Sequence, residues 1–468
     1  MSGHSRLLPL KFPGASLILL LGVFGCSAAQ PPTRPSPAPA NKVNSPRRTA
    51  PAPSTPHVTA VTVPSSPIFP VMLGIDVLEA RGFDAVKGKR IGLLTHPAGV
   101  NRRGISTIDV LRHAPGVKLV ALYGPEHGIY GDEAAEVLIR DRVDKRTGLP
   151  VFSIYGATRK PTKAQLKGID AMVIDLQDIG TRSYTFVSAM RYTMEACFEQ
   201  NIEVIVLDRP NPLGGLKADG PPLDAKWTSY VGAFRVPYVH GLTIGELALM
   251  AKEAPGVLAV SEAVRKRGKL TVIPMRGWRR AMRWPETGLT WVPTSTLIQD
   301  FSAVQGYPMV GLGAFWNPPK IDTGFRHGIG KSYPFRGISH KTAKIDVVER
   351  ELRALNLHGI QFRRVSALDR DGRPAVGLYI EITDYDEWKP TELNFYLMRL
   401  ACKLDPKNPF LPGPGRDFSG FLRHMGSEEF LRALQRYGAR TDVPKYLAEW
   451  DARAKIYQEQ SKRYWLYR

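Results

Sequence analysis

The chain has 468 residues, 43% of them hydrophobic, so it can bury substantial cores and is neither a disordered nor a fibrous protein. Its formal net charge of +21 would suit a nucleic-acid-binding protein. We exclude that class, because the basic residues are scattered and form no stripe interleaved with aromatic residues. A basic surface fits an anionic polymer or an anionic membrane equally well.

Residues 1–26 have the pattern of an export signal. Basic residues precede the apolar run at 15–24, which is too short to span a bilayer. The run ends in Val23-Phe-Gly-Cys26, which resembles a bacterial lipoprotein box, in which the cysteine becomes the lipidated first residue. We therefore expect an exported chain in the cell envelope, anchored to the membrane through a lipid on Cys26 and facing the periplasm or the exterior. The alternative is ordinary cleavage near Ala28 or Ala29.

Residues 27–70 are predicted to form a disordered, proline-rich tether. They contain twelve prolines and no acidic residue, and they cannot bury enough apolar surface to offset their ordering entropy. Such a segment is stiff and extended, so it would space a folded domain away from a membrane. Beyond it, Cys197 and Cys402 lie in apolar, helix-like stretches and indicate neither a disulfide framework nor a thiolate metal site.

Residues 71–290 are predicted to form a Rossmann-like domain with a mainly parallel sheet. Apolar runs without alternation, separated by helical patterns, are typical of a parallel sheet that is covered on both faces. We expect strands at 90–95, 117–123, 150–155, 170–175, 203–208 and 270–274, and helices after Ser106, from Thr162, over 190–198 and from a capping box at Thr243 and Glu246. No Gly-x-Gly-x-x-Gly follows the first strand, so a dinucleotide is not indicated and we expect no cofactor.

Residues 291–468 are predicted to form a smaller, mixed α/β domain. The segment 306–337 is rich in glycine and is expected to be mostly loop. Alternation over 376–383 predicts a half-exposed strand, and amphipathic patterns predict helices at 391–404 and 428–437. The last segment, 443–468, is expected to be helical.

The sharpest pair of polar residues lies in Gly124-Pro-Glu-His-Gly128, directly after the second predicted strand. Ligands of an open parallel sheet bind beyond the carboxyl ends of its strands. We expect Glu126, partly walled by Tyr123 and Tyr130, to serve as a general acid, with His127 beside it as a substrate ligand. The alternative is that Glu126 caps a turn and His127 packs in the interior.

A second polar cluster follows the strand at 170–175. Its candidate substrate ligands are Asp175, Gln177, Asp178, Arg182 and Tyr184. The two aspartates could instead cap helices or form a buried pair with an arginine. The arginine in turn either binds a carboxylate of the substrate or pairs with one of these aspartates, and both interpretations stay open.

Further candidates follow the strand at 203–208. Asn211 is held between two prolines, Asp219 lies in a second constrained loop, and His240 could face a ligand. For Asp208 and Arg209 a structural ion pair is at least as good an interpretation as catalysis. We expect no metal, because the histidines and aspartates lack the ligand spacing of a metal motif.

Four motifs occur in a fixed order along the chain. They are Gly-Pro-Glu-His-Gly at 124–128, Asp-x-Gln-Asp-x-Gly-x-Arg-x-Tyr-Thr at 175–185, Leu-Asp-Arg-Pro-Asn-Pro at 207–212 and His-Gly-Leu-Thr-Ile-Gly-Glu-Leu-Ala at 240–248. With them, residues 74–468 resemble the bacterial exo-β-N-acetylmuramidase (NamZ-type) family. The resemblance implies a Rossmann-like domain followed by a smaller one. It also implies removal of non-reducing terminal N-acetylmuramic acid from peptidoglycan fragments in cell-wall turnover, with muropeptide sugars as partners.

By this resemblance the motif glutamate of the family falls on Glu126. The surrounding site motifs fall on His127, Asp175, Gln177, Asp178, Arg182 and Tyr184. Two departures stand out: Asp219 replaces the glutamate that usually precedes Gly-Pro, and residues 322–331 occupy the place of a Ser-Glu-Gly-Arg-Gly-Thr loop. The altered loop bears on the substrate more than on the reaction type.

The residues fit glycoside hydrolysis, which normally needs an acid for the leaving oxygen and a second carboxylate. We take Glu126 as the acid and Asp219 or Asp178 as the second group, and the acetamido group of the sugar also permits substrate assistance. The lactyl carboxylate of N-acetylmuramic acid gives Arg182 a partner. Two other functions stay open: a non-catalytic cell-wall sugar-binding lipoprotein, and a metal-dependent hydrolase of another ester or amide.

Overall fold

The computed structural model describes residues 71–133, 137, 139–312, 321–369 and 371–468. The predicted export signal, the tether and Cys26 lie outside these residues. Within the described ranges, no helix is both long enough and apolar enough to cross a membrane.

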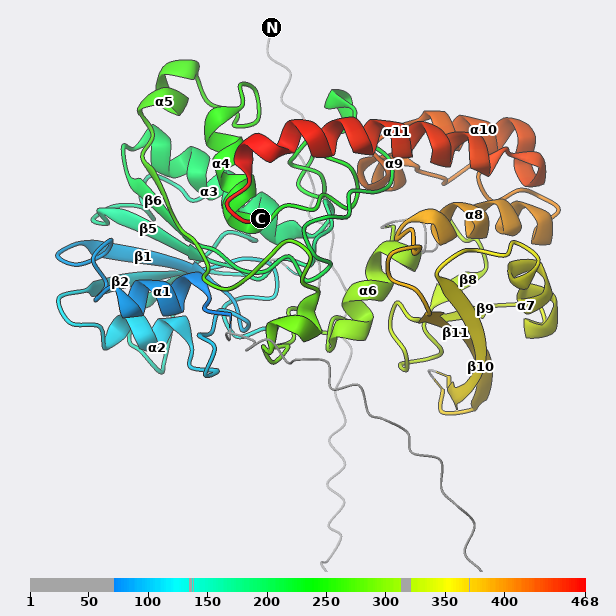
Figure 1. Cartoon of the computed structure of the whole chain (residues 1–468), viewed down its shortest axis with the longest axis horizontal. Coiled ribbons are helices and arrows are strands. Elements are labelled where there is room, and N and C mark those ends of the chain that lie inside the picture. The colour runs from blue at the N-terminus through cyan, green and yellow to red at the C-terminus, as the bar shows by residue number, and fades with distance from the viewer. Residues whose placement is uncertain (1–70, 134–136, 138, 313–320, 370) are drawn as a thin grey trace, which may run out of the picture. The chain divides into compact units, whose positions relative to one another are not determined.

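A seven-stranded, mainly parallel sheet underlies the first part of the described chain, as predicted (Figure 1). The strand order is β3-β4-β2-β1-β5-β6-β7, in which β3 runs antiparallel to β4 and the other neighbours pair in parallel. The strands are β1 (Arg90–Thr95), β2 (Lys118–Gly124), β3 (Arg142–Val143), β4 (Pro150–Ser153), β5 (Ala171–Asp175), β6 (Glu203–Leu207) and β7 (Leu270–Ile273). The short edge strand β3 was not predicted.

Helices cover both faces of this sheet (Figure 1), as unbroken apolar strands require. Ile91 and Leu93 of β1 pack in one core with residues of α1 and α2, whereas Leu94 packs in the other core with α3. The helices are α1 (Gly74–Ala80), α2 (Thr107–Arg112), α3 (Thr185–Glu199), α4 (Ile244–Glu253) and α5 (Glu262–Arg267). Successive side chains of β1 therefore point to opposite faces of the sheet, and each face packs against its own layer of helices.

The predicted helix starts at Ser106 and Thr243 are confirmed, and the one at Thr162 is wrong. The Ser106 hydroxyl accepts a hydrogen bond from the Ile108 amide, and the Thr243–Glu246 capping box is formed. Residues 163–168 form only turns. Gly168, with a φ of +82°, ends this segment before a second helical turn can form.

The second part of the chain has a four-stranded antiparallel sheet, so its mixed α/β character is also confirmed (Figure 1). The order is β10-β11-β9-β8, with β8 (Phe325–His327), β9 (Gly337–His340), β10 (Ile360–Leu368) and β11 (Pro374–Ile382). Its helices are α6 (Phe301–Val310), α7 (Ile345–Arg353), α8 (Glu392–Leu404), α9 (Ser419–Met425), α10 (Glu429–Tyr437) and α11 (Val443–Ser461).

Helix α6 overlaps the segment that was expected to be loop. Its sequence contains Gly306 and Pro308, which lower helix propensity. A Cβ at Gly306 would lie 2.4 Å from the Phe335 carbonyl oxygen, so glycine is needed there for close backbone packing. Tertiary packing overrides local propensity in this helix.

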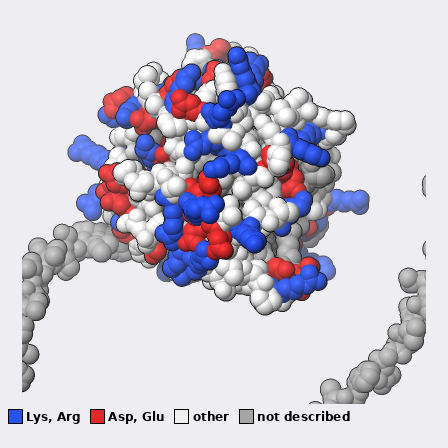
Figure 2. Space-filling view, turned by 90° about the vertical axis from the view of Figure 1, so that its right-hand side faces the viewer, with Lys and Arg blue, Asp and Glu red and all other residues white. Residues whose placement is uncertain are grey.

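One face of the described chain carries charges of both signs. On the face drawn in Figure 2, Lys and Arg side chains lie interspersed with Asp and Glu. Ion pairs such as Arg364–Asp346 and Lys403–Glu351 occur among exposed residues.

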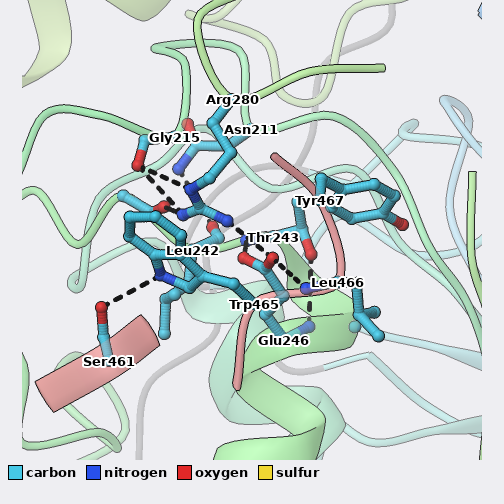
Figure 3. Close-up of polar contacts among 12 residues, drawn as sticks. Asn211, Gly215, Leu242, Thr243, Glu246, Arg280, Ser461, Trp465, Leu466 and Tyr467 are labelled. Carbon is cyan, nitrogen blue, oxygen red and sulfur yellow. Dashed lines mark hydrogen bonds and ion pairs between the residues drawn. The ribbon is translucent and has the colours of Figure 1, made fainter. Parts of the chain in front are cut away.

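The end of the chain packs against the first sheet domain (Figure 3). Arg280 and Glu246 form a buried ion pair of 2.6 Å, and the same Glu246 oxygen accepts a 2.9 Å bond from the Leu466 amide. The Tyr467 hydroxyl donates to Asp208 at 2.5 Å. Residues 465–468 are therefore not helical, contrary to the prediction, because their backbone and side chains bind this buried cluster.

Substitution of Tyr467 by phenylalanine tests the contribution of this tail. The change removes a donor from the buried Asp208 carboxylate and an acceptor from the Met275 amide, which binds the same hydroxyl at 2.9 Å. We expect the free energy of unfolding to fall by about 1–3 kcal/mol, measured by urea denaturation. Tyr437→Phe removes an exposed hydroxyl and serves as the control, with a change within about 0.5 kcal/mol. Equal stability of the two variants would contradict this account.

Candidate functional site

The candidate site lies at the carboxyl ends of the parallel strands. From β1 the chain continues to β2 on one side of the sheet, and β5 pairs with β1 on the other side. This change of direction opens a crevice between the loops that follow the strands. His96 follows β1, Glu126 follows β2, and Gln177 and Asp178 follow β5.

A tight turn presents Glu126. The Gly128 amide donates to the Pro125 carbonyl at 3.0 Å, and His127 has a φ of +69°, which side-chain-bearing residues seldom adopt. The His127 ring bonds through Nδ1 to the Glu133 carbonyl at 2.9 Å. Strained backbone of this kind concentrates at functional sites, so the turn supports a functional role for Glu126.

Glu126 is half-buried and contacts side chains from several elements. Thr185, the first residue of α3, donates its hydroxyl to Glu126 Oε2 at 2.7 Å. Burial, with the charge and hydrogen bond of Glu126, raises the pKa of Tyr155 to about 12. Burial also raises the pKa values of Tyr230 and Tyr307, and the negative charge of Glu126 adds to both shifts.

The tyrosines near Glu126 are not the expected ones. Tyr123 was predicted to wall it, but its hydroxyl donates to the Gln165 carbonyl at 2.6 Å. Tyr130, the other predicted wall, is 40% exposed and donates to Asp144.

Asp178 is buried and held by groups from two loops. Its Oδ2 accepts from the Gly180 amide at 2.8 Å and lies 3.1 Å from His240 Nε2. His240 Nδ1 accepts from the Leu242 amide at 3.2 Å, so Nε2 is assigned the proton that it donates to Asp178. Asp178 Oδ1 is buried and has no hydrogen-bond partner in the described part of the chain, so one oxygen of this carboxylate is unsatisfied.

Gln177 and His96 form a second pair beside Asp178. The Gln177 side-chain amide donates to the backbone carbonyls of Asp178 and Pro210 at 2.8 and 3.0 Å. The Gln177 backbone N–H donates to His96 Nε2 at 2.8 Å. Burial, together with the charges of Arg209 and His127, holds the pKa of His96 well below its usual value. His96 is therefore neutral, with its proton on Nδ1.

The contacts of Asp175 favour the ion-pair interpretation. Arg209 forms a bidentate ion pair with Asp175, with Nε 2.5 Å from Oδ1 and Nη2 2.9 Å from Oδ2. The Thr107 hydroxyl also donates a hydrogen bond to Asp175 Oδ2. The residue is fully buried. The predicted pairing of Arg209 with Asp208 is wrong, because the Arg209 guanidinium binds Asp175 instead.

Arg182 likewise has structural partners rather than a substrate carboxylate or an aspartate. Its guanidinium is 1% exposed and donates to four backbone carbonyls, those of Pro221, Val236, His424 and Met425, at 2.7–3.1 Å. Burial lowers the pKa of Arg182 to about 10. These contacts tie the two parts of the chain together and favour a positioning role.

Two other predicted ligands also make internal contacts. The Tyr184 hydroxyl donates to Thr294 at 2.6 Å, and its ring packs edge-on against Phe186 at 4.9 Å. The Asn211 side chain donates to the Leu242 carbonyl at 3.0 Å and accepts from the Leu213 amide at 3.0 Å. Both residues shape the loops around the site.

Asp219 joins the loop at 217–221 to the second domain. Its Oδ2 accepts from the Thr391 amide at 2.7 Å and from the Thr391 hydroxyl at 2.9 Å. Burial raises the pKa of Asp219, although the Thr391 bonds oppose this shift. The carboxylate therefore anchors the residue that precedes α8.

Two cavities lie near or beyond this cluster. One of about 250 Å³ is lined by Gln177 and Arg209, together with Asn101, Trp284 and neighbours. Another of about 750 Å³ lies in the second domain, and none of the predicted site residues lines it. Among the described residues, no three His, Cys, Asp or Glu side chains group as they would around a metal ion.

Several contributors to the site were missed from the sequence. Tyr155 and Arg159 follow β4 just as Glu126 follows β2, so the same strand-end argument could have found them. Tyr230 and Tyr307 carry no comparable local signal, because they reach the site only through tertiary packing.

Comparisons with known proteins place both parts of the chain in one family. The family description "Exo-beta-N-acetylmuramidase NamZ, N-terminal" matches residues 91–302, and the corresponding C-terminal description matches residues 320–467. The chain is 34% identical over 403 residues to the peptidoglycan β-N-acetylmuramidase NamZ of Bacillus subtilis (strain 168), covering 85% of this chain and 91% of that protein.

Two solved structures from Bacteroides fragilis NCTC 9343, both of DUF1343 family proteins, share the fold. One is 37% identical with a TM-score of 0.75, and the other is 25% identical with a TM-score of 0.63. Each comparison covers 85% of this chain and 99% of the other. With both halves matched in order, the chain belongs to the exo-β-N-acetylmuramidase NamZ family.

Proposed function

We propose that this chain is an exo-acting glycoside hydrolase that removes non-reducing terminal N-acetylmuramic acid from peptidoglycan fragments. The observation that carries the proposal is a half-buried carboxylate, Glu126, on a strained strand-end turn in a member of this family. Glycoside hydrolysis requires a proton donor for the leaving oxygen, and Glu126 is our candidate for that role.

Asp178 is our preferred second carboxylate. Its Oδ1 is buried and unpartnered within the described ranges, whereas the Asp219 carboxylate accepts two bonds from Thr391. Both Glu126 and Asp178 contribute to the raised pKa of Tyr307, so the two carboxylates share one neighbourhood. Asp178 could act on water, on the anomeric carbon or on the acetamido group of the sugar.

The two rival functions have less support. A non-catalytic sugar-binding lipoprotein would not need a carboxylate on a strained turn, and the curated relative is named as an enzyme. A metal-dependent hydrolase finds no support from residue spacing in the sequence.

Replacement of Glu126 by glutamine tests the acid role through the leaving group. We expect kcat to fall about 10²- to 10⁴-fold on the disaccharide N-acetylmuramyl-N-acetylglucosamine, because its leaving sugar must be protonated. The loss should be much smaller on 4-nitrophenyl N-acetylmuramide, whose leaving group departs as an anion. Glu199→Gln, at a surface residue paired with Lys160, is the control. Equal losses on the two substrates would remove Glu126 as the acid.

Asparagine substitutions at Asp178 and Asp219 separate chemistry from anchoring. Asp178→Asn should lower kcat on both substrates by about 10²-fold or more, since the second carboxylate acts whatever the leaving group. Asp219→Asn should mainly lower the free energy of unfolding, because it weakens the contact with Thr391. Kinetics and urea denaturation of both variants check this assignment. A stable, inactive Asp219→Asn beside an active Asp178→Asn would reverse it.

We also propose that the protein is exported and lipid-anchored at Cys26. The support is the basic and apolar leader that ends in Val23-Phe-Gly-Cys26, followed by the proline-rich segment. Mass spectrometry of the mature amino terminus, after expression in a bacterial host, should find a lipid-modified Cys26. An unmodified terminus near Ala28 or Ala29 would contradict the anchor.

A further inference from the structure

We propose that Arg159 forms a carboxylate-binding subsite beside Glu126, and that this subsite recognises the lactyl carboxylate of N-acetylmuramic acid. The inference rests on the proposed function and names a specificity residue for it. It moves the carboxylate-binding role from Arg182, whose two terminal nitrogens donate to four backbone carbonyls, to Arg159.

Tyr155 lies between Arg159 and Glu126 and interacts with both. The Arg159 guanidinium carbon is 3.4 Å from the centre of the Tyr155 ring and 4.9 Å from that of Tyr230. The two tyrosine rings lie 5.7 Å apart. Burial and the interaction with Glu126 raise the pKa of Tyr155 and the interaction with Arg159 lowers it, so the proposed acid and the cation both act on this tyrosine.

The guanidinium has capacity left for a ligand. Arg159 Nη1 is buried and has no hydrogen-bond partner among the residues that the structure describes. A buried N–H without a partner is unfavourable, and an incoming carboxylate would relieve that penalty.

Three buried arginines of the sheet domain are already paired with carboxylates. Arg191 binds Glu195 at 3.1 Å, Arg209 binds Asp175 and Arg280 binds Glu246. Lys160, the residue next to Arg159, lies 2.8 Å from Glu199. Arg182 also has an unpartnered Nε, but both of its terminal nitrogens already donate to carbonyls, whereas the unpartnered atom of Arg159 is a terminal nitrogen.

The chemistry of the substrate fits this arrangement. N-acetylmuramic acid differs from N-acetylglucosamine by a lactyl ether that carries a carboxylate, so one carboxylate distinguishes the two sugars. A planar guanidinium binds a carboxylate through two parallel N–H bonds, which a lysine ammonium cannot reproduce. Stacking on Tyr155 fixes the plane of the Arg159 guanidinium before the ligand binds, which reduces the side-chain entropy lost on binding.

Binding of the two free sugars by calorimetry tests the subsite directly. We expect Arg159→Gln to weaken binding of N-acetylmuramic acid about 10- to 100-fold and to leave binding of N-acetylglucosamine unchanged. On 4-nitrophenyl N-acetylmuramide the same variant should raise KM more than it lowers kcat, since the carboxylate is bound in ground and transition states alike. Arg159→Lys should recover only part of the affinity.

Lys160→Gln is the matched control, because it removes the same charge from the neighbouring residue and should leave both affinities unchanged. Unchanged N-acetylmuramic acid binding in Arg159→Gln would overturn the subsite. So would an equal loss for both sugars, which would indicate a structural role through Tyr155. A wild-type protein that binds N-acetylmuramic acid but hydrolyses neither substrate would refute the proposed function alone. A wild-type protein that binds neither sugar would overturn both.

Discussion

The buried ion pair between Asp175 and Arg209 holds the site together. It joins the ends of β5 and β6, and the same arginine reaches the Val100 carbonyl after β1 at 2.7 Å while Thr107 of α2 donates to the same aspartate. Removing one partner of such a pair leaves an uncompensated buried charge, which is strongly destabilising. Three strand ends are thereby fixed in register, and the loops that carry Gln177 and Asp178 start from that fixed point.

The second domain has an analogous anchoring function. Arg182 binds the carbonyls of His424 and Met425, Asp219 binds Thr391, and the tail at 465–468 closes over the Arg280–Glu246 pair (Figure 3). The polar residues of the shared motifs therefore divide into two classes. Arg182 and Asp219 position loops through contacts between the two parts of the chain, whereas Asp178 keeps one buried carboxylate oxygen without a hydrogen-bond partner among the described residues.

The strands of the sheet could be predicted because each is marked by an apolar run within its own short stretch of sequence. Unbroken apolar runs predicted six of the seven strands, and strand-end turns predicted the places of Glu126 and Asp178. Helix α6 was missed because Gly306 and Pro308 oppose a helix locally while packing against Phe335 requires the glycine. The segment after Thr162 was overpredicted, since a left-handed glycine stops it after one turn.

The roles of individual side chains were harder to predict, because their partners are distant in sequence. Arg182 meets carbonyls more than 240 residues away, and Asp219 meets Thr391 at a separation of 172. Tyr230 and Tyr307 reach the neighbourhood of Glu126 only in the folded chain. A single sequence names the residues capable of chemistry, whereas the fold decides which of them have capacity left for a substrate.

The central claim is that this strand-end cluster releases one sugar at a time from the non-reducing end of peptidoglycan. Mass spectrometry of products from defined, peptide-free glycan fragments tests it directly, with and without a chelator. The account predicts free N-acetylmuramic acid as the first product, a remainder shortened by one sugar, and no effect of the chelator. Internal cleavage fragments, intact substrate, or hydrolysis that the chelator abolishes would contradict it.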